Sequence, residues 1–169
     1  MRLLTLVRHA KSSWDYAELT DFERPLNARG RRDAPAMAAR LRAGSPPDRL
    51  VSSPALRAIT TARLFAQALD LSEDGIAILP RIYDASLPTL LDVVRELDDA
   101  SGNVALFGHN PGLSLLALEL SADPVLELPT CGIVQLELPA RRWREIAPAS
   151  GRVRWHDWPK KTATPHHAG

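Results

Sequence analysis

Residues 3–12 read LLTLVRHAKS, a mostly aliphatic run that leads directly into an arginine, a histidine and small polar residues. Such a run predicts a short buried strand with ionisable side chains, Arg8 and His9, at its carboxyl end. We expect the rest of the chain to be built around that end.

Strand-like and helix-like segments alternate along the chain. Asn27 is expected to cap the first helix, and Pro35 to delay its start or bend it. The acidic segment 14–24 should be an irregular loop. Strands are predicted at 49–52, 76–79, 103–107, 133–138, 143–146 and 153–155, and helices at about 27–44, 54–69, 90–97 and 111–120.

Repeated strand–helix units predict an α/β fold, a three-layer α/β/α sandwich with a mostly parallel central sheet. The 169 residues, 45% of them hydrophobic, favour one domain. We place this domain at residues 1–159, without a large cap insertion, and expect a flexible tail at 160–169.

Composition excludes several classes of protein. The net charge of +1 gives no overall field for nucleic acid or an anionic membrane. Cys131 is the sole cysteine, so we expect no internal disulfide and a buried thiol in a reducing compartment. The N-terminus does not resemble a signal peptide, and no run reaches the roughly 18 apolar residues of a membrane helix. We therefore expect a cytoplasmic location; the oligomeric state stays open.

The carboxyl ends of parallel strands meet at one edge of a sheet, where open α/β sheets bind ligands. Guanidinium groups suit the oxygens of a phosphoryl group, and neighbouring cations favour a neutral imidazole. Such an imidazole could attack phosphorus and form a phosphohistidine, while a carboxyl group protonates the leaving group and then activates water. The residues predicted at this edge are Arg8, His9, Ser53, Arg57, Asp84 and His109.

This set resembles the histidine phosphatase superfamily, which has the phosphoglycerate-mutase-like fold. The family's Arg-His-Gly signature has alanine in third place here, and Arg8 to Ser12 is similar to the short, cap-less SixA-type phosphohistidine phosphatase branch. The resemblance continues through Arg24-Pro25-Leu26 with Arg29-Gly30, Ser52-Ser53-Pro54 with Arg57, and Gly108-His109-Asn110-Pro111.

The resemblance implies that His9 is the phosphorylated nucleophile and that Arg8, Arg57 and His109 bind the phosphate. It makes Asp84 the candidate proton donor, although Asp84 could instead cap the helix that begins near Ser86. Arg24 could reach the pocket from its loop, and Ser53 could contact phosphate or cap a helix.

The favoured function is removal of phosphate from protein phosphohistidine, with a phosphotransfer protein as partner, because the chain lacks insertions that would enclose a small metabolite. Hydrolysis of a small phosphoester or sugar phosphate is the alternative, and a catalytically silent phosphate-binding domain is a third. Two histidines and one aspartate could hold zinc, but two arginines would repel it, so we expect no metal. No nucleotide fingerprint is present, and we expect no cofactor.

Overall fold

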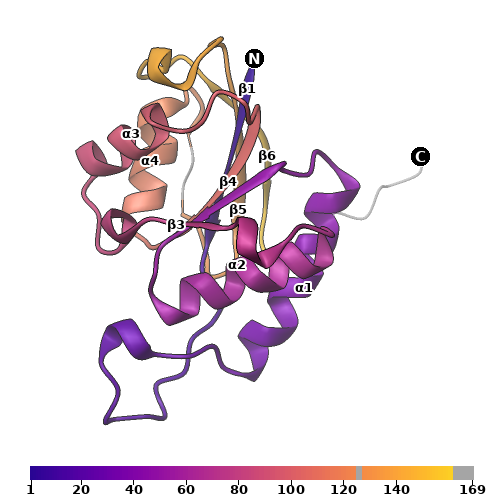
Figure 1. Cartoon of the computed structure of the whole chain (residues 1–169), viewed down its shortest axis with the longest axis vertical. Helices are drawn as coiled ribbons and strands as arrows, with labels where there is room; N and C mark the ends of the chain where they lie inside the picture. The colour runs from indigo at the N-terminus through magenta and orange to yellow at the C-terminus, as the bar shows by residue number, and fades with distance from the viewer. Residues whose placement is uncertain (125–126, 162–169) are drawn as a thin grey trace.

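The fold is built on a six-stranded sheet with the order β3-β2-β4-β1-β5-β6 (Figure 1). It is a computed structural model that describes residues 1–124 and 127–161. The strands are β1 (Arg2–Arg8), β2 (Arg49–Ser52), β3 (Ala77–Ile78), β4 (Asn103–Gly108), β5 (Ile133–Leu138) and β6 (Arg152–Asp157).

The first four strands run parallel, which places their carboxyl ends at one edge of the sheet. Strand β4 pairs with β1 on one side and β2 on the other, and β3 pairs with β2. Strand β5 runs antiparallel to β1, and β6 antiparallel to β5. The predicted α/β fold with a mostly parallel sheet is confirmed.

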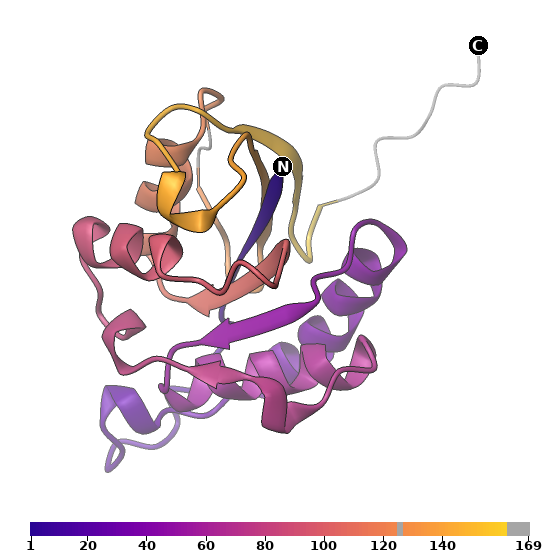
Figure 2. The same ribbon diagram turned by 45° about the horizontal axis from the view of Figure 1, so that its top comes forward.

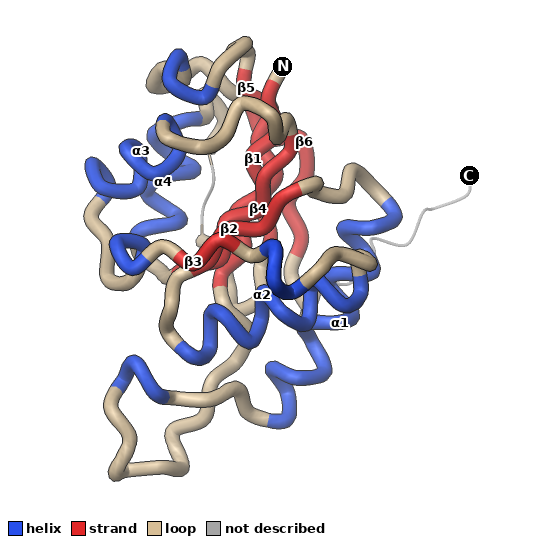
Figure 3. The backbone as a smooth tube through the Cα atoms, viewed as in Figure 1, coloured by secondary structure: helices blue, strands red, loops and turns tan. Residues whose placement is uncertain are grey.

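Two pairs of helices cover the two faces of the sheet, as Figures 2 and 3 show. Helices α1 (Ala28–Ala43) and α2 (Leu56–Ala68) lie on one face, and α3 (Leu87–Arg95) and α4 (Gly112–Leu120) on the other. Strand β1 serves both cores, because successive side chains of a strand point to opposite faces. Its Leu4 and Leu6 join the core under α3 and α4, and its Val7 joins the core under α1 and α2.

Helix α1 begins immediately after its cap. The Asn27 Oδ1 atom accepts a hydrogen bond of 2.8 Å from the Gly30 amide. Pro35 lies inside the helix, so the predicted late start is wrong. Ala34, Met37 and Leu41 are buried on either side of the proline, and their packing holds the helix on the sheet.

Other elements also differ from the prediction. Residues 143–145 form a 3-10 turn where a strand was predicted, because the Trp143 side chain is fully buried and its Nε1–H donates to the Ser101 carbonyl. Helix α2 begins at Leu56 rather than at residue 54. Helix α3 begins at Leu87, earlier than predicted, because Ser86 caps it.

Most of the predicted tail, residues 162–169, lies outside the described residues. Within the described part of the chain, no helix is both long enough and apolar enough to cross a membrane. The single domain over residues 1–159 stays a prediction.

Candidate active site

The site begins where β1 ends. The His9 amide donates to the Gly108 carbonyl of β4 (3.1 Å), and the Cys131 amide donates to the carbonyls of both Arg8 and His9 (3.1 and 3.0 Å). Cys131 is buried, as predicted, and burial raises the pKa of its thiol, which therefore stays protonated. These backbone contacts fix the point from which the Arg8 and His9 side chains depart.

The imidazole of His9 is held as a neutral base. Its Nδ1 atom lies 2.8 Å from the Ala10 carbonyl, which can only accept a hydrogen bond, so Nδ1 carries the proton and Nε2 keeps its lone pair. The Nε–H of Arg57 points to this Nε2 atom at 3.4 Å. Burial, followed by the charge of Arg57, lowers the pKa of His9 to about 3. At neutral pH the ring is therefore uncharged and able to act as a nucleophile.

Arg57 lies in the first turn of α2, which is tied to the segment after His9. The Thr61 hydroxyl accepts from the Ala10 amide (3.0 Å) and donates to the Arg57 carbonyl (2.7 Å). Thr61 thus ties the first turn of α2 to the segment after His9, and the Arg57 guanidinium reaches the imidazole of His9 although 48 residues separate the two in sequence.

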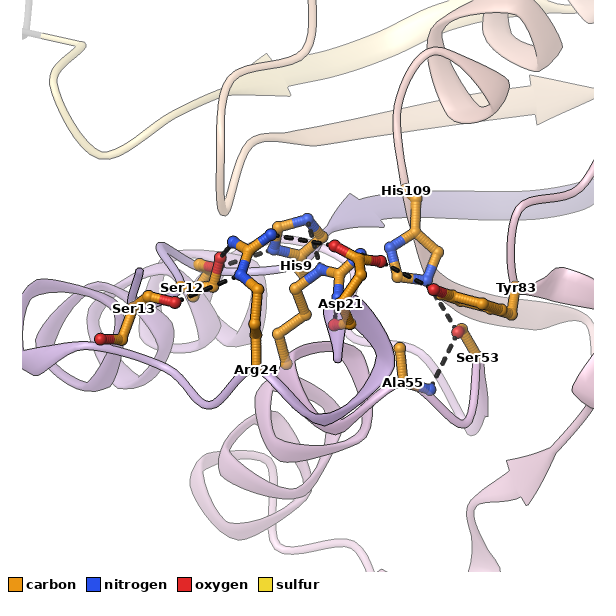
Figure 4. Close-up of polar contacts among 11 residues, drawn as sticks. His9, Ser12, Ser13, Asp21, Arg24, Ser53, Ala55, Tyr83 and His109 are labelled. Carbon is orange, nitrogen blue, oxygen red and sulfur yellow. Dashed lines mark hydrogen bonds and ion pairs between the residues drawn. The ribbon is translucent and has the colours of Figure 1, made fainter. Parts of the chain in front are cut away.

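His109 follows β4 and faces the same space (Figure 4). Its ring centroid lies 5.4 Å from that of His9, and its Nε2 shares a hydrogen bond of 2.8 Å with the Ser53 hydroxyl. Burial and the charge of Arg57 lower the pKa of His109 to about 4. Ser53 also accepts from the Ala55 amide, so it both orients His109 and supports the turn before α2.

Two buried polar atoms of the site have no hydrogen-bond partner among the described residues. They are Nε of Arg8 and Nδ1 of His109. The Arg8 Nη1 atom donates to the Leu128 carbonyl (3.1 Å), which also accepts from the Asn110 amide group. Because buried polar groups are usually paired, two unpaired ones in residues expected to bind phosphate favour an oxyanion site.

The loop of residues 13–25 reaches the site from below α2 (Figure 1). Its base is closed by a bridge between Ser12 and Leu26 and by a hydrogen bond from the Ser13 amide to the Pro25 carbonyl. Gly30 lets α1 approach this base, because a Cβ atom there would lie 2.2 Å from the Lys11 carbonyl oxygen. The loop is therefore anchored at both ends.

Arg24, whose place in the pocket the sequence left open, is brought to the site. It donates to the Ser13 carbonyl and the Ser12 hydroxyl and pairs with Asp21 at 3.0 Å. The indole of Trp14 stacks on the guanidinium, with the Arg24 Cζ atom 3.4 Å from the ring centroid.

Sequence reasoning missed Asp21, which occupies the middle of the site. Its Oδ2 atom accepts from Arg57 Nη2 (3.0 Å) and from the Tyr83 hydroxyl (2.7 Å), and its carbonyl accepts from Arg57 Nη1 (2.6 Å). In the sequence, Asp21 is one of several acidic residues in an irregular loop, and only its place three residues before Arg24 could have singled it out.

Asp84 lies farther out than the other predicted residues. It is exposed, has a φ of 51°, and lines a cavity of about 290 Å³ together with Asp21, Tyr83 and His109. Ser86, whose hydroxyl accepts from the Thr89 amide, is the cap of α3, so the alternative that Asp84 caps this helix is wrong. The structure leaves Asp84 at the rim, within the same cavity.

Metal ligands do not gather here. Across residues 1–124 and 127–161, no group of three or more histidine, cysteine, aspartate or glutamate side chains is arranged to hold a metal ion. The groups that do gather are three guanidiniums, from Arg8, Arg24 and Arg57, with two neutral imidazoles. Such a set suits a phosphoryl group.

The two imidazoles should make stability depend on pH. In the unfolded chain each takes up a proton near pH 6.5, whereas in the fold the pKa values of His9 and His109 are about 3 and about 4. Below pH 6.5 the unfolded state binds more protons, so the free energy of unfolding should fall as the pH drops towards 4. The slope is at most about 1.4 kcal/mol per pH unit for each histidine.

Chemical denaturation across this range measures the slope. The matched variant His9→Gln/His109→Gln should show a shallower dependence, because all other titrating groups are shared. Equal slopes in the two proteins would contradict burial of the imidazoles in neutral form.

Comparison with known proteins gives concordant matches. Residues 4–86 match the histidine phosphatase superfamily (branch 1). An uncharacterized chloroplastic protein of Arabidopsis thaliana is 30% identical over 163 residues, which cover 91% of this chain and 74% of that protein.

The fold is shared with several solved structures. The protein histidine phosphatase SixA, complexed with tungstate, superposes with a TM-score of 0.79 at 22% identity over 93% of this chain and 97% of that one. A mycobacterial glucosyl-3-phosphoglycerate phosphatase in complex with VO3 gives a TM-score of 0.66 at 17% identity, covering 92% and 98%. At these identities the likeness concerns the fold alone.

Proposed function

Because the chain belongs to the histidine phosphatase superfamily (branch 1), we propose that it is a metal-independent phosphatase that works through a phosphohistidine on His9. One observation carries the proposal: a buried, neutral imidazole, whose unprotonated Nε2 faces the Nε–H of Arg57, stands beside the ring of His109. That is the arrangement a nucleophile needs in order to attack a phosphoryl group held by cations.

The reaction has two steps. With the phosphoryl oxygens held by Arg8, Arg57 and His109, Nε2 of His9 forms a bond to phosphorus while the bond to the leaving group breaks and a carboxyl group protonates that group. The carboxylate then takes a proton from water, which attacks the phosphohistidine; the P–N bond breaks, neutral His9 is restored, and inorganic phosphate leaves. Asp84, at the rim of the cavity, is the proposed proton donor, and Ser53 positions His109 through their hydrogen bond.

Exposed aromatic side chains around the site favour a protein substrate. Trp14, Tyr16 and Phe22 are 74%, 50% and 40% exposed on the 13–25 loop. Phe22 packs edge-on against Tyr83, which packs edge-on against His109. Aromatic residues are enriched in protein interfaces, and they offer a polar metabolite few hydrogen bonds. SixA, which shares the fold, is described as a protein histidine phosphatase, so we assign protein phosphohistidine as the substrate class.

Acidic side chains on the same loop add to this preference. Asp15 and Glu18 are exposed beside the aromatic residues. Their charge opposes small phosphorylated metabolites that carry further anionic groups, and attracts a basic protein surface. The proposed partner is a phosphohistidine-bearing phosphotransfer protein that presents a basic surface to this loop. A cytoplasmic location stays a prediction.

A substrate panel tests the proposal. The pure protein, with a chelator present, should release phosphate from a phosphohistidine-bearing phosphotransfer domain with a higher kcat/KM than from phosphorylated metabolites. In the Trp14→Ala/Phe22→Ala variant, the ratio of kcat/KM for the phosphoprotein to kcat/KM for p-nitrophenyl phosphate should fall roughly tenfold, because interface aromatics carry much of the binding energy.

Leu118→Ala is the matched control, since Leu118 is 54% exposed but lies on α4. This variant should keep the ratio. A preference for one metabolite, with the ratio intact in the aromatic variant, would favour the small-phosphoester alternative. No turnover of any phosphorylated compound would favour a silent phosphate-binding domain.

A further inference from the structure

We propose that Asp21 is an autoinhibitory residue whose carboxylate occupies the oxyanion position beside His9 in the free protein and is displaced by the phosphoryl group that binds there. This inference rests on the proposed function, because it assumes that His9 receives the phosphoryl group. Four contacts of Asp21 carry it: two with Arg57, one with Tyr83 and one with Arg24.

One edge of the Arg57 guanidinium contacts both His9 and Asp21. Its Nε–H points to Nε2 of His9 at 3.4 Å, and its Nη2–H bonds to Oδ2 of Asp21 at 3.0 Å. The Nε and Nη2 hydrogens lie on one edge of the planar fork, the edge that binds two oxygens of a single carboxylate or phosphate. The Asp21 oxygen therefore stands next to the nucleophilic nitrogen, where an oxygen of the attacked phosphoryl group has to bind.

Two further side chains bind the Asp21 carboxylate. Tyr83 donates to Oδ2 of Asp21 at 2.7 Å, and Arg24 pairs with Oδ1 at 3.0 Å. Figure 4 shows the contact between the Asp21 side chain and Tyr83 as a dashed line, in the same close-up as His9 and His109. A carboxylate bound by two guanidiniums and a phenol has the environment expected for an oxyanion ligand.

The carboxylate can leave without unfolding the loop. Its side chain is 52% exposed, so it has room to rotate outward. The Asp21 carbonyl separately accepts a hydrogen bond from Nη1 of Arg57, at 2.6 Å, and this contact does not involve the carboxylate. Displacement thus needs rotation of the Asp21 side chain alone, while the backbone of Asp21–Glu23 stays hydrogen-bonded to Arg57 of α2.

Charge makes the carboxylate an effective competitor. The hydrogen bond from Tyr83 and the charge of Arg57 hold the pKa of Asp21 below its usual value, so a full negative charge stands at the guanidiniums at neutral pH. Every anion that binds there has to break the same contacts of Asp21, so the carboxylate lowers the affinity for monoanions and dianions by a common factor. The preference for a dianion comes from the guanidiniums themselves, which attract two charges more strongly than one.

Oxyanion titration tests this role without requiring turnover. The probes are inorganic phosphate, a dianion at about pH 8, and dimethyl phosphate, a monoanion, each titrated calorimetrically into wild type and Asp21→Asn. The variant should bind phosphate roughly tenfold more tightly or better, and its gain for dimethyl phosphate should be similar, because both anions have to displace the same carboxylate. Asp74→Asn, which removes an exposed carboxylate from the segment between α2 and β3, should bind both within about twofold of wild type.

Phosphate binding by Asp21→Asn that is unchanged or weaker overturns the inference. If Asp21→Asn binds phosphate no more tightly than wild type, with an unchanged thermal unfolding midpoint, the carboxylate merely orients Arg57 and the proposed function stands. If wild type neither binds phosphate nor hydrolyses any substrate, the proposed function itself fails and this inference fails with it.

Discussion

Replacing His9 by alanine is expected to lower kcat/KM by roughly 10⁴-fold or more, because the reaction loses the group that forms the intermediate. The fold should be kept, since the His9 side chain bonds to the neighbouring Ala10 carbonyl and to Nε of Arg57, while the strand before it is fixed by backbone contacts. The rate of phosphate release by His9→Ala measures the loss of activity, and its circular dichroism spectrum measures whether the fold is kept.

His156→Gln is the matched control, because His156 is also partly buried but lies on β6. This variant should retain turnover. In a rapidly quenched reaction of wild type, the phosphoryl group should be found on His9 as an acid-labile adduct. Phosphate on His109 and none on His9 would contradict the assignment of the nucleophile.

Replacing Arg57 by lysine is expected to lower kcat/KM by about 10²–10³-fold, the loss that follows removal of one preorganised donor at an oxyanion. Lysine keeps the positive charge but loses the planar fork that contacts His9 through Nε and Asp21 through Nη2. Its single ammonium group cannot present two parallel N–H bonds to the phosphoryl oxygens. Steady-state kinetics with the preferred substrate measures the loss.

Arg63→Lys provides the control on the same helix, because Arg63 is an exposed residue of α2. It should leave kcat/KM within about twofold of wild type. A loss of less than about tenfold in Arg57→Lys would mean that charge alone suffices, and the fork geometry would then have no part in transition-state binding.

Local patterns predicted the parallel sheet and the edge where the site lies. Leu3 to Val7 is apolar at every position except Thr5, which is typical of a strand covered on both faces, and this strand lies inside the sheet between β4 and β5. The one wrong element type occurred where a side chain distant in sequence decides local structure. Trp143 forms a turn because its indole docks on Ser101, and such a contact leaves no trace in a window of neighbouring residues.

The sequence by itself determined that Arg8, His9, Arg57 and His109 would converge, because chain direction and right-handed crossovers leave little freedom for residues at the ends of parallel strands. Only the tertiary structure decided the place of Asp21. Its carboxylate acquires its position from Arg57, 36 residues away, and from Tyr83, 62 residues away, and no regular periodicity links a loop to either. Strand ends are positioned by the sheet, whereas a loop carboxylate is positioned by whichever cations the folded chain brings within hydrogen-bonding distance.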